Sequence, residues 1–249
     1  MSLEAASTLP EMIEVWQQTL NWQPTNEEQN QFQKLYELVI DANRYLNLTR
    51  ITEPSEFWEK HLWDSLVGVA QKQQFMDGLN QGLSVIDIGT GAGFPGLPIS
   101  LIFPNSQVTL LDSTRKKINF IDSVIDGLGI KNAQTVVGRV EEIGQEIKHR
   151  ESYDLAVIRA VGSVSACAEY CLPLVKKGGL AVIYRGSFTE EEKQSLENSV
   201  NILGGKVELI EEFTTPLSHS IRHCLFLRKV KHTPVSFPRP VGIPKQKPL

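Results

Sequence analysis

Residues 85–96 read Val85-Ile86-Asp87-Ile88-Gly89-Thr90-Gly91-Ala92-Gly93-Phe94-Pro95-Gly96. A short apolar run, typical of a buried strand, leads into alternating glycines, and an apolar helical pattern follows over residues 97–103. Glycine lets the backbone approach a ligand closely because it has no Cβ. The stretch therefore predicts a strand, a ligand-binding turn and a helix, with the turn at the carboxyl end of the strand.

Strand and helix patterns alternate after this stretch. Apolar runs typical of strands lie at 84–88, 108–111, 135–137, 155–158, 180–184, 207–210 and 224–227. Helical patterns lie between them at 97–103, 115–128, 164–175 and 189–203. Because the runs are apolar on both faces, we predict an α/β fold with a mostly parallel seven-stranded sheet and helices on both faces. No helical pattern separates the last two runs, so they are expected to form a hairpin with an antiparallel terminal strand.

The chain divides into three predicted parts. Residues 1–72 show helical spacing of apolar side chains, as at Trp16 and Leu20, and form a predicted N-terminal helical extension packed on the main domain. Residues 73–230 hold the glycine-rich turn and the sheet. Residues 231–249 are rich in proline and lack periodicity, so we expect a basic, extended C-terminal arm.

The composition is typical of a globular protein. Of 249 residues, 41% are hydrophobic and 22% are charged, which argues against disorder, collagen and coiled coil. Three cysteines cannot form a disulfide framework, which favours a reducing compartment. The N-terminus lacks the pattern of a signal peptide, and no run approaches the roughly 18 apolar residues of a membrane span. We therefore expect a cytoplasmic protein without membrane contact.

Charge is unevenly distributed along the chain. There are 25 Lys and Arg against 29 Asp and Glu, a net charge of −4, yet residues 213–249 contain seven basic side chains and no acidic one. A basic segment on an acidic body suggests a local contact with a polyanion. On charge alone, a solvated basic tail is the simpler interpretation.

An acidic side chain at the end of the next strand indicates the kind of ligand. Asp112 stands where a carboxylate can accept both hydroxyl groups of an adenosine ribose. The spacing of Gly91, Gly93 and Gly96 also satisfies the dinucleotide fingerprint, which alone is a weak signal. Two adenosine-containing cofactors therefore compete, S-adenosylmethionine and a nicotinamide dinucleotide.

Three observations favour S-adenosylmethionine. Asp87, two residues before Gly89, would repel a pyrophosphate but attract a sulfonium or an ammonium group. The dinucleotide fold usually has two similar halves, whereas here a single sheet ends in a hairpin. After the third strand, Val140 can face an adenine ring, and Glu141 stands beside it as a polar neighbour.

The sequence also excludes several methyl acceptors. Residues 154–162, which comprise the fourth strand and the segment after it, lack the Asn/Asp-Pro-Pro-aromatic turn of enzymes that methylate exocyclic amines. Cys167 and Cys171 lie on one apolar helix face and Cys224 lies in a strand, so core packing is predicted rather than a thiolate nucleophile. No Ser-His-Asp arrangement and no metal-ligand spacing appear, so no metal is expected.

Guanine N7 is compatible with these exclusions. Its lone pair is free, so transfer needs alignment with the methyl group and stabilisation of the positive product rather than a general base. No catalytic side chain is assigned, although Arg159 is the best candidate for positioning. Arg139, Arg159 and Arg185 follow strand ends at the predicted cleft and suit phosphate or guanine.

The chain resembles the glucose-inhibited division protein B family, the bacterial 16S ribosomal RNA guanine-N7 methyltransferases. The similar stretches are residues 47–51, 61–66, 87–98, 112–117 with Phe120, 138–141, 159–160 and the terminal 239–249. The glycine stretch extended by Phe94-Pro95-Gly96 is the most specific of them. The resemblance covers the chain apart from about the first 25 residues.

The resemblance implies a Rossmann-like class I methyltransferase fold, S-adenosyl-L-methionine as cofactor, and a guanosine in the decoding-region loop of 16S ribosomal RNA as target. It implies donor contacts at Gly89, Phe94, Asp112, Ser113, Thr114, Val140, Glu141 and Arg159, to which the glycine turn adds Gly91. RNA contacts are expected at Arg139, Arg185, Arg239, Lys245 and Lys247. Two positions depart from the family pattern, Ile158 and Arg185. For His61 and Asp64, helix-to-sheet packing and substrate handling are equal alternatives.

The sequence thus predicts a monomeric methyltransferase for ribosomal RNA processing, whose partner is 16S ribosomal RNA or the small ribosomal subunit. Two alternatives stay open: a nicotinamide-dependent oxidoreductase, and a non-enzymatic RNA-binding protein with a vestigial fold. Removal of residues 231–249 is expected to weaken RNA binding more than donor binding.

Overall fold

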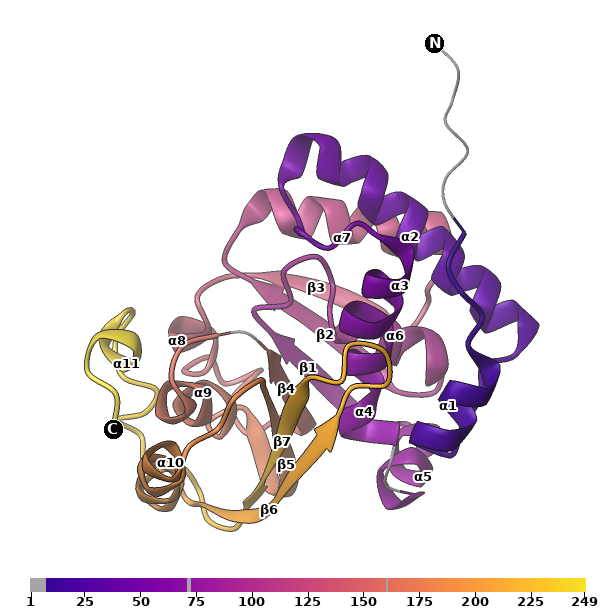
Figure 1. Ribbon diagram of the computed structural model, residues 1–249. Helices are drawn as coiled ribbons and strands as arrows, with labels where there is room; N and C mark the ends of the chain where they lie inside the picture. The colour runs from indigo at the N-terminus through magenta and orange to yellow at the C-terminus, as the bar shows by residue number, and fades with distance from the viewer. Residues whose placement is uncertain (1–7, 71–72, 160) are drawn as a thin grey trace.

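A single mixed sheet forms the centre of the molecule (Figure 1). The computed structural model describes residues 8–70, 73–159 and 161–249, and within them seven strands pair in the order β3-β2-β1-β4-β5-β7-β6. The strands are β1 (Ser84–Ile88), β2 (Gln107–Asp112), β3 (Ala133–Val137), β4 (Tyr153–Arg159), β5 (Val175–Arg185), β6 (Gly205–Thr214) and β7 (Ile221–Lys229). Strands β1 to β5 pair in parallel, and β7 is antiparallel to both β5 and β6. The predicted sheet and its terminal hairpin are confirmed.

Helices cover both faces of this sheet. They are α1 (Ile13–Leu20), α2 (Asn26–Leu46), α3 (Pro54–Phe57), the π-helix η1 (Trp58–Trp63), α4 (Asp64–Ala70), α5 (Gln73–Gln81), α6 (Gly96–Ile102), α7 (Arg115–Leu128), α8 (Val140–Ile143), α9 (Val164–Cys171), α10 (Glu190–Ile202) and α11 (Ile243–Gln246). Figure 1 shows α2, α6 and α7 on one side of the strands and α9 and α10 on the other.

Alternate side chains of each strand enter two separate hydrophobic cores. Val85 belongs to the core beneath α6 and α7, whereas its neighbour Ile86 belongs to the core beneath α9 and α10, as the two-residue period of a strand requires. Cys167 and Cys171 are buried in this second core, and burial raises the pKa of the Cys167 thiol to about 12. Their predicted packing role is confirmed.

The N-terminal helices share the first core with the sheet. Trp16 of α1 contacts the ring of Trp58 at a centroid distance of 4.7 Å, and Phe32 of α2 stacks on Trp16 at 6.3 Å. The helical prediction is confirmed for the described part of this segment, and residues 1–7 and 71–72 lie outside the described residues. The division of the chain at residue 72 stays a prediction.

The C-terminal tail lies against the body of the protein, and its description as a separate arm stays a prediction. The Arg150 guanidinium donates hydrogen bonds to the carbonyl oxygens of Phe237 at 2.7 Å and Thr233 at 2.9 Å. A short helix, α11, forms in the tail, and Pro244 in its first turn is buried. A proline-rich segment makes few hydrogen bonds of its own, and here side chains of the body supply the partners.

Candidate active site

The glycine turn brings the backbone close to the ends of β1 and β2. Gly89 has a φ of +68°, which an L side chain rarely adopts, and its N–H donates to Leu111 O at 2.8 Å. At Gly96 an added Cβ would lie 2.6 Å from Leu110 Cδ2 and 2.9 Å from Asp87 Oδ2. Glycine is therefore required at both positions, one for its backbone conformation and one for close packing.

Asp87 holds the turn from below rather than facing the donor. Its Oδ2 accepts hydrogen bonds from Thr90 Oγ1 at 2.5 Å and from Gly96 N at 2.8 Å. The side chain is fully buried, and burial raises its pKa to about 6. Asp87 does not line the cavity at the strand ends. The carboxylate points into the turn, so the attraction of a sulfonium group expected from the sequence would act without direct contact, and it stays a prediction.

A cavity of about 500 Å³ lies over the turn, at the carboxyl ends of β1 to β4, and is called the donor cavity below. Eight of the nine predicted donor contacts line it: Gly89, Gly91, Asp112, Ser113, Thr114, Val140, Glu141 and Arg159. Phe94 is the exception. It is buried beneath the turn, where its ring stacks on His61 at a centroid distance of 4.4 Å. Phe94 therefore shapes the site through His61 rather than from the cavity wall.

Asp112 is oriented by the backbone at the end of β2. Its Oδ2 accepts from Gly91 N at 3.1 Å, and its Oδ1 accepts from Thr114 N at 2.8 Å. These contacts fix the carboxylate at the cavity wall. A carboxylate oxygen can accept more than one hydrogen bond, so Asp112 can still receive the two hydroxyl groups of a ribose.

Glu141 offers a second fixed acceptor in the donor cavity. Its side chain is buried, and Oε1 accepts from Gly242 N at 3.0 Å. Among the described residues, Oε2 is buried without a hydrogen-bond partner. Such an atom costs stability unless a ligand supplies a donor, and the exocyclic amine of adenine is one. A cavity with Asp112 and Glu141 at its wall fits the adenosine part of S-adenosylmethionine.

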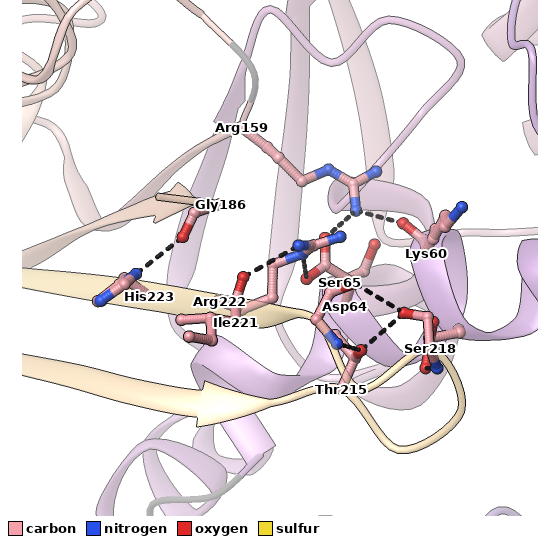
Figure 2. Close-up of polar contacts among 12 residues, drawn as sticks. Lys60, Asp64, Ser65, Arg159, Gly186, Thr215, Ser218, Ile221, Arg222 and His223 are labelled. Atoms are coloured by element: carbon pink, nitrogen blue, oxygen red, sulfur yellow. Dashed lines mark hydrogen bonds and ion pairs between the residues drawn. The ribbon is translucent and has the colours of Figure 1, made fainter. Parts of the chain in front are cut away.

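Arg159 stands between the donor cavity and a neighbouring one. Its Nη1 donates to Lys60 O at 2.9 Å and to Asp64 Oδ2 at 3.0 Å (Figure 2). The guanidinium lies 5.9 Å above the Phe94 ring. These contacts hold Arg159 in one position, as its predicted role requires. Ala160, which follows it, lies outside the described residues.

The neighbouring cavity, of about 440 Å³, is called the second cavity. It is lined by Ile51, Lys60, His61, Asp64, Arg159, Tyr184, Arg185, Gly186 and Arg222. The π-helix η1 presents several of these groups, and π-helical turns are frequent at functional sites. Lys60 and Arg222 were not identified from the sequence. Both are isolated basic residues, and only folding brings them together from η1 and β7.

His61 is a neutral member of the second cavity. Its Nε2 lies 2.8 Å from Thr49 Oγ1, and its ring packs on Phe94. Burial, with smaller contributions from Arg159 and Lys60, lowers its pKa to about 3. His61 and Asp64 are both buried and both line the second cavity, so the geometry is compatible with either alternative from the sequence, and substrate handling stays a prediction.

The predicted RNA-binding residues lie in different environments. Arg139 and Lys245 line the donor cavity, and Arg185 lines the second cavity, where its Nη2 donates to Glu192 Oε1 at 2.6 Å. Lys247 is exposed away from both cavities.

Arg239 has a structural role in the tail. Its Nη2 and Nε donate to the fully buried carboxylate of Glu169, at 2.6 Å and 3.0 Å. This pair anchors the tail, and the RNA contact expected at Arg239 stays a prediction.

Comparison with known proteins assigns the chain to a family. Residues 28–233 match the profile described as rRNA small subunit methyltransferase G. The chain belongs to this family. A ribosomal RNA small subunit methyltransferase G from Trichormus variabilis is 68% identical over 97% of this chain and 98% of its own length. One from Trichodesmium erythraeum is 59% identical over 97% and 94%.

Membership of the methyltransferase G family confirms the predicted enzyme class and its cofactor, S-adenosylmethionine. The oxidoreductase and non-enzymatic alternatives are set aside. NSun6 from Pyrococcus horikoshii is similar in fold, with a TM-score of 0.52 at 16% identity, over 71% of this chain and 56% of its own. None of the helices described is long and apolar enough to cross a bilayer, and no three His, Cys, Asp or Glu side chains gather as a metal site in the described residues.

Proposed function

We propose that this chain methylates N7 of a guanine in 16S ribosomal RNA, with S-adenosylmethionine as the donor. The observation that carries the proposal is the pair of cavities that meet at Arg159. One has the fixed carboxylates that suit an adenosine, and the other is lined by basic side chains that suit a nucleotide of RNA. The relatives that match the full length are named as methyltransferases of small-subunit ribosomal RNA.

The side chains present fit an acceptor that needs no deprotonation. When bound, S-adenosylmethionine supplies an electrophilic methyl group, whose S–C bond breaks as the N7 lone pair forms the new N–C bond. His61 has a pKa near 3 and its ring nitrogens face Thr49 and Arg159, so it is not arranged as a general base. What the chain must contribute is alignment, and Arg159 is fixed where the two ligands would meet.

The proposed partner is 16S ribosomal RNA or the small subunit, reached in the cytoplasm by a monomer. Arg139, Lys245 and Arg222 surround the two cavities and supply the basic contacts. Phosphate contacts of this kind make affinity fall steeply with salt. Arg185 contributes less, since Glu192 already neutralises it.

The test of the proposed function is methylation of small-subunit RNA. Tritium should pass from labelled donor to 16S RNA or to small subunits from cells that lack the protein. Mapping should find the label on one guanine N7. Asp112→Ala should abolish transfer and also weaken binding of S-adenosylhomocysteine, as measured by calorimetry. Absence of transfer to naked RNA, precursor particles and finished subunits alike would refute the proposal.

A further inference from the structure

We propose that the second cavity is the binding site for the acceptor guanine and that Arg222 is the residue that selects guanine over adenine. This inference rests on the proposed function and adds a specificity determinant to it. Its basis is a cavity whose wall is fixed by a buried network and whose side-chain donors outnumber its acceptors. A base can enter such a cavity only when it is turned out of its RNA stack.

Arg222 is held in place from two sides. Buried Glu59 of η1 accepts hydrogen bonds from Leu217 N at 2.5 Å and Ser218 N at 2.9 Å, which ties the β6–β7 loop to η1. On the other side, His223 Nδ1 lies 2.8 Å from Gly186 O, which ties the start of β7 to the end of β5 (Figure 2). Arg222 lies between these two ties, so its position is set before any ligand arrives.

Asp64 lies between two arginine side chains, Arg159 and Arg222. Oδ2 of Asp64 accepts from Arg159 Nη1 at 3.0 Å, and Oδ1 lies 3.7 Å from Arg222 Nε (Figure 2). The carboxylate thus holds two guanidinium groups on one side of the cavity. Arg222 also donates from Nη1 to Ile221 O at 3.0 Å, and no hydrogen bond from its Nη2 is found in the described part of the chain. Asp64 is a positioning residue here, since it acts through the two arginines.

The guanidinium donors of the second cavity match the hydrogen-bonding edge of guanine better than that of adenine. The Hoogsteen edge of guanine carries two acceptors, O6 and N7, whereas that of adenine carries the N7 acceptor and the N6 amino donor. N7 must stay free to react, so recognition has to use the neighbouring position. An arginine can donate to O6 of guanine but repels the N6 amino group of adenine. Arg159 lies at the donor cavity, next to where N7 would react. Lys60 is paired with Glu56 at 2.6 Å and Arg185 with Glu192 at 2.6 Å, so among the basic side chains of the second cavity Arg222 is the one placed to reach O6.

The experiment combines substitutions with two small probes. Guanosine 5′-monophosphate and adenosine 5′-monophosphate are tested as inhibitors of methyl transfer to small-subunit RNA. Wild-type protein should be inhibited more strongly by the guanine nucleotide. Arg222→Ala should lower kcat/KM for the RNA about ten- to a hundredfold and remove this preference, while S-adenosylhomocysteine binds as before. Arg222→Lys should retain part of the preference, because lysine can donate a single hydrogen bond to O6.

Two controls make the outcome decisive. Arg44→Ala, which removes an arginine with a 72% exposed side chain on α2, should behave as wild type. Thermal melting shows whether each variant is folded, and Arg222→Lys carries the test if Arg222→Ala is not. If wild type methylates the RNA but both Arg222 variants keep full kcat/KM and the guanine preference, the inference is overturned and the proposed function stands. If wild type transfers no methyl group at all, the proposed function fails and this inference fails with it.

Discussion

His61 shows how one buried residue links the site to stability. Its neutral ring is held between Phe94 and Thr49, and its pKa is lowered from 6.5 to about 3, chiefly by burial. The unfolded chain therefore binds a proton that the folded chain does not, and stability is lost as pH falls from about 6.5 toward 3. Between pH 7 and pH 5 we expect the wild type to lose about 2 kcal/mol more than His61→Asn, measured by urea unfolding at each pH.

Asp87 acts in the opposite direction over a similar pH range. Its pKa is raised from 3.8 to about 6 by burial, so the folded chain holds the extra proton and stability rises as pH falls from about 6 toward 4. The two effects partly cancel in the wild type. The difference between wild type and His61→Asn isolates the histidine, and equal pH profiles for the two proteins would contradict the assignment of a neutral His61.

The residues around the donor cavity show which side-chain positions the sequence can specify and which it cannot. Asp112 and Glu141 were predicted to face the ligand because parallel strands end at one edge of the sheet, and both line the donor cavity. Phe94 was placed at the ligand too, yet it is buried beneath the turn and does not line the cavity. Strand periodicity does not extend into a glycine turn, where the direction of a side chain depends on backbone angles that the sequence leaves open.

At the scale of elements, the turn between β1 and α6 is predicted to tolerate no methyl group at Gly96. Gly96→Ala would press a Cβ against Leu110 and Asp87, breaking the hydrogen bond to Asp87 Oδ2. We expect a loss of about 1–3 kcal/mol in the free energy of unfolding and weaker binding of S-adenosylhomocysteine, measured by chemical denaturation and calorimetry. The matched control is Gly127→Ala on the exposed side of α7, where the added Cβ would lie 3.9 Å from Leu38 Cδ1, an ordinary van der Waals distance.

Opposite signs are expected for these two substitutions. Alanine in a helix interior is favoured over glycine by roughly 0.5–1 kcal/mol, so Gly127→Ala should raise stability and leave ligand binding unchanged. A Gly96→Ala protein as stable as wild type, with unchanged affinity, would show that the turn can relax around the added methyl group.

Elements with strong periodicity were predictable, and the irregular ones were not. The strands and the capping box at Thr189 before α10 follow from local patterns, and the structure has both. The π-helix η1 carries the same apolar spacing as an ordinary helix, so nothing local distinguishes it. The second cavity depends on η1 meeting the start of β7, a contact between distant parts of the chain that periodicity does not report.

At the scale of the whole molecule, the C-terminal tail closes one end of the donor cavity. Gly242 N donates to Glu141 Oε1, the Arg239–Glu169 pair anchors the segment, and Lys245 lines the cavity. Sequence composition indicated only a basic arm that binds RNA. The structure changes this expectation: loss of residues 231–249 should weaken donor binding as well as RNA binding, since a wall of the cavity is lost.

Two neighbouring lysines of the tail separate these effects without removing the segment. Lys245 lines the donor cavity, whereas Lys247 is exposed away from it. Lys245→Ala should weaken S-adenosylhomocysteine binding about fivefold, corresponding to roughly 1 kcal/mol, and Lys247→Ala should leave it unchanged. Calorimetry at fixed salt measures both. The two substitutions remove the same charge from one short segment. If both variants bind S-adenosylhomocysteine with the affinity of wild type, the tail acts on RNA alone. If only Lys245→Ala loses affinity, the tail is part of the donor site.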